Sequence, residues 1–126
     1  MNSMNMTVGW LGFGAGAVSG ALIGLRFHAE EWMGGYGAFR RRLLRLGHIA
    51  CFGVGFLNVL FALSAVHPGA GAAVHWGGLA LAWAQVAMPL VCFLTAWRAE
   101  FRHLFSIPVL LIGTGICGMV LNQFAS

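Results

Sequence analysis

The chain has 126 residues, of which 60% are hydrophobic and only 8% are charged, whereas soluble domains carry about a quarter charged residues. Its basic residues are all arginines, its acids are three glutamates, and the formal net charge is +4. This composition excludes a soluble globular domain. It also argues against a nucleic-acid partner, because the arginines fall in short segments between apolar runs and not on one face of a soluble fold.

Apolar stretches long enough to cross a bilayer as helices, about 20 residues each, occur at 8–27, 43–66, 74–97 and 104–124. Charged side chains occur only near the ends of these stretches. We therefore predict an all-α integral membrane four-helix bundle with up-down topology, formed by the single domain 1–126. No positive residue precedes the first stretch, which favours a true span over a secretory signal.

The arginines predict the orientation of the chain. They lie in the first connection and at its edges (Arg26, Arg40, Arg41, Arg42, Arg45) and in the third connection (Arg98, Arg102). Cytoplasmic loops of membrane proteins carry the excess of Lys and Arg. Both termini and the second connection are therefore predicted outside. The arginine-only, Ala- and Gly-rich composition indicates a bacterial inner membrane.

The first span carries a glycine at every fourth position: Gly12, Gly16, Gly20 and Gly24. In a helix this spacing places the glycines on one face. A face without side chains lets a neighbouring helix approach to backbone contact. We therefore predict a helix-packing seam along this face.

The second and third spans each carry a stripe of small and polar residues at helical spacing. The stripes hold His48, Cys51, Gly55, Asn58 and Ala62, and His75, Gly78, Ala82, Gln85, Pro89 and Cys92. Gly115, Gly118 and Asn122 form a narrower stripe in the fourth span. We predict that all three stripes face the interior of a compact bundle. Counting helical rises puts Asn58 and Gln85 at similar depths, in position to hydrogen-bond each other.

These amides have two interpretations. Asn58, Gln85 and Asn122 either hold the helices together, at about 0.6 kcal/mol per hydrogen bond, or line a polar pocket for a quinone head group, a small solute or a water. The cysteines Cys51, Cys92 and Cys117 lie in apolar runs and are predicted to be packing residues without a disulfide.

The histidines raise the possibility of a cofactor. Haem b between two helices needs two imidazoles facing each other at one depth, for which His48 is the candidate inside a span and His103 or His28 the second ligand. Against this, histidines at span ends are ordinary interfacial residues. Copper is a further alternative, since thioethers and imidazoles suit Cu(I). Its candidate ligands on the outer side are Met1, Met4, Met6, His67 and His75.

The functional hypotheses rest mainly on absent signatures. The sequence has no Walker loop, G-x-S-x-G, H-E-x-x-H or C-x-x-C motif, and no carboxylate lies within a span. This pattern favours a small non-catalytic subunit or assembly helper of a larger membrane complex over an enzyme. A b-type haem electron-transfer protein and a small channel or carrier lined by Asn58 and Gln85 remain the alternatives.

Overall fold

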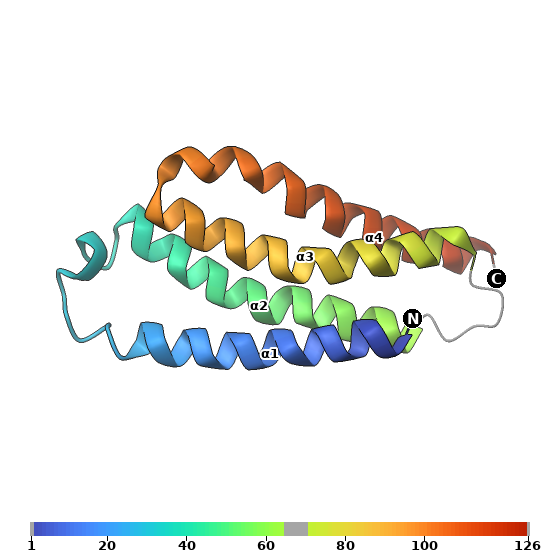
Figure 1. The fold of residues 1–126 in the computed structure, drawn as a ribbon, viewed down its shortest axis with the longest axis horizontal. Coiled ribbons are helices and arrows are strands. Elements are labelled where there is room, and N and C mark those ends of the chain that lie inside the picture. Colours follow the sequence, from blue (N-terminus) through green and yellow to red (C-terminus); the bar gives the residue numbers. More distant parts are fainter. Residues whose placement is uncertain (1, 65–70, 126) are drawn as a thin grey trace.

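The computed structural model describes residues 2–64 and 71–125, which form four long α-helices (Figure 1). The long helices are α1 (Asn2–Gly24), α2 (Phe39–Ser64), α3 (Ala72–Trp97) and α4 (Ser106–Ala125). Two 3-10 helices, η1 (Trp32–Gly34) and η2 (Ala99–Phe105), lie in the first and third connections. All four long helices are long and apolar enough to cross a membrane. The predicted all-α, multi-pass membrane bundle is confirmed.

The bounds of the helices differ from the predicted spans most clearly at the start of the chain. The predicted first span was 8–27, but α1 begins at Asn2 and ends at Gly24. Hydropathy detects apolar residues and not backbone geometry, so it misses a polar first turn that is nevertheless helical. α2 begins at Phe39 instead of residue 43. Its predicted end, residue 66, lies outside the described residues.

The helices pack in chain order. α1 packs on α2, α2 on α3, and α3 on α4, while α1 also touches α3. α4 meets α2 only slightly and, among the described residues, makes no contact with α1. The bundle is therefore less compact than predicted, because α4 sits on the outside of α3 (Figure 1). Half of the most apolar 18-residue stretch of α3 is buried inside the bundle. In the fourth span, Ala99–Phe124, the buried share of the corresponding stretch is 17%.

The two ends of the bundle differ in charge. The start of α1 and the end of α4 lie at one end, and the connections containing η1 and η2 lie at the other (Figure 1). The arginines lie in these two connections and in the first turns of α2. All basic charge is therefore gathered at the end opposite the termini, as expected for helices that cross a bilayer an even number of times.

The interior stripes explain how α2 and α3 come together. The stripe residues of α2 are buried, apart from His48, which is half-buried, and α3 buries Gly78, Gln85, Pro89 and Cys92. His75 was predicted on the interior stripe of α3 but is exposed. At this end of α3 the covered face runs through Val74, which is buried in the core with Phe61 of α2, and not through its neighbour His75. Trp76 and Trp83, which lie off this stripe, are exposed.

Candidate functional site

Three helices meet around a pair of asparagines in the core. Asn5 on α1 donates through Nδ2 to Oδ1 of Asn58 on α2, at 2.8 Å, and to the carbonyl oxygen of Gly78 on α3, at 2.8 Å. Asn58 donates in turn to the carbonyl oxygen of Leu81 on α3, at 3.0 Å. Both asparagine side chains are fully buried. This amide clamp, Asn5 with Asn58, ties α1, α2 and α3 together.

Asn5 is the main polar residue that the sequence did not predict. The predicted first span begins at residue 8, so Asn5 lies outside it. One signal would have found this residue: Gly9 and Asn5 lie three and seven residues before Gly12, which places them on the same helical face as the predicted seam. Both face α2, since a Cβ on Gly9 would lie 2.8 Å from the carbonyl oxygen of Gly55. The seam therefore begins earlier than predicted and starts with an amide.

The predicted pairing of Asn58 with Gln85 is wrong. Gln85 donates through Nε2 to the carbonyl oxygen of Cys51 on α2, at 3.0 Å, and Asn58 bonds to Leu81, one turn earlier on α3. Counting helical rises gives depth alone and ignores how two helices cross. Asn5 occupies the position opposite Asn58 that was expected for Gln85. Both predicted amides are nevertheless buried in the interior.

The glycine face of α1 lies against α2 and α3 over most of its length. A Cβ on Gly12 would overlap the amide of Gln85, one on Gly16 would lie 2.5 Å from the ring of Phe52, and one on Gly20 would lie 2.5 Å from the ring of His48. Gly24 was predicted in the same seam, but a Cβ there would meet nothing within 4 Å. The seam ends before Gly24 because α1 itself ends there and the chain turns away.

A groove of about 420 Å³ runs between α1 and α3, with α2 at its floor. We call it the α1–α3 groove. Its walls are mainly apolar and include Leu11, Ala15, Ala82, Val86, Leu90 and Phe93. Gln85, Cys51 and Ser19 add its polar atoms. The Oε1 atom of Gln85 is buried and has no hydrogen-bond donor among the described residues. Gln85 therefore brings an unpaired acceptor, covered by Gly12 of α1, to the wall of the groove.

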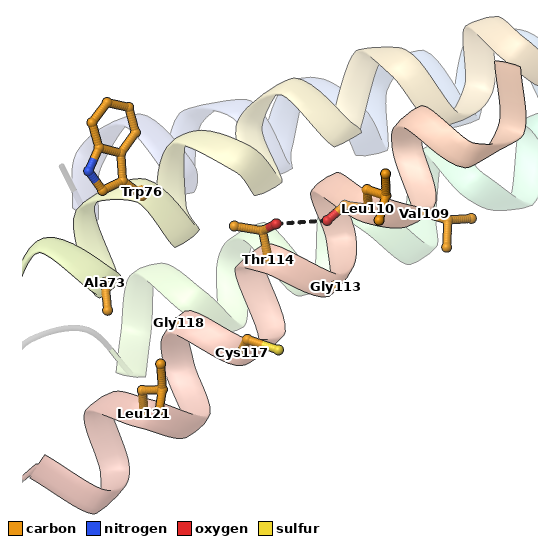
Figure 2. Close-up of a pocket in the computed structure, with 9 residues that line it drawn as sticks. All are labelled: Ala73, Trp76, Val109, Leu110, Gly113, Thr114, Cys117, Gly118 and Leu121. Atoms are coloured by element: carbon orange, nitrogen blue, oxygen red, sulfur yellow. Dashed lines mark hydrogen bonds between the residues drawn. The ribbon is translucent and has the colours of Figure 1, made fainter.

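A second, larger groove of about 550 Å³ lies between α3 and α4. Figure 2 shows the residues that line this α3–α4 groove: Ala73 and Trp76 from α3, and Val109, Leu110, Gly113, Thr114, Cys117, Gly118 and Leu121 from α4. Small residues on both helices alternate with larger apolar ones. Thr114 donates to the carbonyl oxygen of Leu110 in its own helix, at 2.9 Å, so its hydroxyl group is already engaged. The α3–α4 groove therefore offers a complementary shape to a partner but no free hydroxyl group from Thr114.

The histidines proposed for haem are not gathered around a common space. His48 packs between α2 and α1, where its Nδ1 lies 2.9 Å from the carbonyl oxygen of Gly16 and 3.3 Å from Oγ of Ser19. His28 and His103 are exposed. His103 lies in η2, which packs on α3 and α4. An imidazole that bonds to a carbonyl oxygen donates its Nδ1 proton, so this nitrogen serves helix packing.

The remaining predicted residues lie apart from one another. Asn122 is half-buried on α4, and Cys51, Cys92 and Cys117 are free thiols. Of the copper candidates, Met1 and His67 lie outside the described residues. Within 2–64 and 71–125, no group of three or more His, Cys, Asp or Glu side chains is placed to hold a metal ion. The haem and copper alternatives gain no supporting contact.

A buried arginine holds the first connection against the bundle. Arg41 is only 2% exposed, and its guanidinium group donates to the carbonyl oxygens of Phe27 and Glu30, each at 3.2 Å. The same group lies 4.7 Å from the ring centre of Phe27 and 5.7 Å from that of Trp32. Buried cations need such partners to offset the cost of desolvation. Arg41 therefore holds the first connection in its folded conformation. From the sequence, this arginine was used only to predict the orientation of the chain in the membrane.

The described residues thus offer an amide clamp, two lipid-facing grooves and an arginine-held connection. The hydroxyl group of Ser19 lies beside the imidazole of His48, and both groups are bonded to the carbonyl oxygen of Gly16. No protein-family model, curated protein or solved structure matches this chain.

Proposed function

We propose that this protein is a non-catalytic subunit or assembly helper of a larger membrane complex, which docks a partner's transmembrane helix in the α3–α4 groove. The observation that carries the proposal is the position of α4, which packs on α3 almost alone and leaves a groove of about 550 Å³ beside it. Helices of a self-contained bundle bury their small-residue faces against one another. Here part of that face stays uncovered.

The composition of the groove supports a helix as its occupant. Gly113, which is half-buried, and Cys117, which is exposed, lie one turn apart on α4, and a Cβ on Gly113 would meet nothing within 4 Å. Helix association in membranes depends on close backbone approach at such small residues, because apolar side chains gain little by leaving lipid. Trp76 stands at the rim, where a large aromatic side chain adds contact area for a partner.

The test is to fill the groove and ask whether a partner is lost. The variant Gly113→Leu places a side chain in the groove, and Gly53→Leu makes the same change on the exposed side of α2. Neither added Cβ would meet an atom within 4 Å, so both variants should fold. We expect a larger membrane protein to co-purify with the wild type and with Gly53→Leu, and to be lost from Gly113→Leu. Recovery of the chain alone from native membranes, in every variant, would refute the helper function.

We also propose that the membrane is a bacterial inner membrane and that both termini lie on its non-cytoplasmic side. The support is the gathering of the arginines at one end of the bundle, because the Lys and Arg excess marks the cytoplasmic side. A cysteine placed at Ser3 should react with a membrane-impermeant maleimide in intact cells, whereas one placed at Gly37 should react only after lysis. The reverse pattern would overturn the orientation.

A further inference from the structure

We infer that the α1–α3 groove is a binding site for a lipophilic molecule that carries a hydroxyl group, which donates a hydrogen bond to Oε1 of Gln85. This site is separate from the α3–α4 groove, and it does not depend on the docking of a partner. Its volume of about 420 Å³ lies within the range of small-molecule sites, about 300–1,000 Å³.

The side-chain oxygen of Gln85 has no hydrogen-bond donor among the described residues. The Gln85 side chain is 7% exposed, and its Nε2 is held by the carbonyl oxygen of Cys51, which fixes the amide. Oε1 is left buried without a donor. An unsatisfied polar atom in an apolar environment costs about 1–3 kcal/mol. A ligand that supplies the missing donor recovers that free energy.

Pro89 lies one turn after Gln85 and also lines the groove. Proline has no backbone N–H group, so the main-chain carbonyl of Gln85 lacks the usual donor four residues later. The same residue thus presents an unpaired side-chain oxygen and a main-chain oxygen without its normal helical partner. Both are acceptors. A ligand for this turn of α3 needs a donor, which selects an alcohol or a phenol over an ether or a ketone.

A single water is a poorer partner for these oxygens than a lipophilic alcohol. A buried water needs two to four polar partners, and the two oxygens of Gln85 meet only the lower end of that range. The hydroxyl group of Ser19, which also lines the groove, is already bonded to the carbonyl oxygen of Gly16 and contacts His48. The walls are otherwise apolar, as expected for a groove that faces acyl chains. The apolar part of a membrane-soluble molecule fits these walls, and its single hydroxyl group matches the acceptor.

Gly12 on α1 lies over the amide of Gln85 so closely that a Cβ there would overlap it. α1 touches α3 far less than it touches α2. A small displacement of α1 away from α3 therefore brings Oε1 to the surface of the groove and keeps the hydrogen bond from Nε2 to Cys51. Gly12 keeps that movement possible because it adds no side chain.

The experiment compares matched probes. 4-Nonylphenol and its methyl ether, 4-nonylanisole, differ in the donor hydrogen alone, and 1-dodecanol with its methyl ether forms an aliphatic pair. Saturable binding is measured by equilibrium dialysis against the full chain in nanodiscs, with protein-free nanodiscs subtracted. For the wild type we expect the hydroxyl compound of at least one pair to bind about tenfold more tightly than its ether, the equivalent of one hydrogen bond. The pair that shows the difference identifies the ligand as aromatic or aliphatic.

The variants connect that preference to the groove. Gln85→Leu should lower the hydroxyl-to-ether ratio to about one, and the matched Gln123→Leu on α4 should leave it at about ten. Ala15→Phe keeps Gln85 and fills the groove from the exposed side of α1, so it should abolish saturable binding of all probes even if Gln85→Leu fails to fold. Binding that survives Ala15→Phe, a hydroxyl preference that survives Gln85→Leu, or no saturable binding to the wild type would each overturn the inference.

Discussion

Removal of the Asn58 side chain is expected to destabilise the bundle by about 2 kcal/mol. In Asn58→Ala two interhelical hydrogen bonds are lost, from Asn5 and to the carbonyl oxygen of Leu81. At about 0.6 kcal/mol each they account for about 1.2 kcal/mol. Asn58 has no exposed surface, so the missing atoms leave a void that adds roughly 1 kcal/mol. The free energy of unfolding is to be measured by SDS titration in mixed micelles, followed by circular dichroism.

A double-mutant cycle isolates the clamp from the void. Asn5→Ala, Asn58→Ala and the double variant should give a coupling energy of about 0.6 kcal/mol, and at most about 1.7 kcal/mol. Asn122→Ala is the control, because this half-buried amide makes no side-chain hydrogen bond to a described residue. It should cost below about 0.5 kcal/mol. Equal costs for Asn58→Ala and Asn122→Ala, or a coupling energy of zero, would refute the assignment of Asn58 as a clamp.

Two further predictions use neighbouring positions as matched controls. Gly16→Leu should lower the free energy of unfolding by about 2 kcal/mol or more in the same titration, because the new side chain meets the ring of Phe52. Gly24→Leu is the control: its side chain faces open space, so the change should stay within about 0.5 kcal/mol. Equal effects of the two variants would contradict the seam. Arg41→Ala should speed hydrogen exchange of the amides in 25–38 by roughly 10- to 100-fold, through loss of charge-assisted hydrogen bonds of about 1.5–3 kcal/mol. Arg42→Ala, at an exposed position, should change exchange little, and similar rates in both variants would show that the connection folds without Arg41.

The glycine face illustrates how far a helical pattern can be read. The spacing predicts a close-packed face on the first span, and Gly12, Gly16 and Gly20 do lie against neighbouring helices. The pattern does not reveal where that face stops being covered, which is why Gly24 was included. Periodicity reports which residues share a side of a helix, and the end of the helix decides which of them have a neighbour.

The membrane-spanning character of the chain, its number of helices and the charge difference between its ends follow from the sequence alone, because transfer into lipid depends on the composition of about 20 consecutive residues. The partners of the polar groups do not. That Asn58 meets Asn5 instead of Gln85, that Oε1 of Gln85 is left without a donor, and that α4 touches little besides α3 depend on how the helices cross and which side chains they bring to one level. These are relations between segments far apart in the chain, so only the tertiary structure decides them.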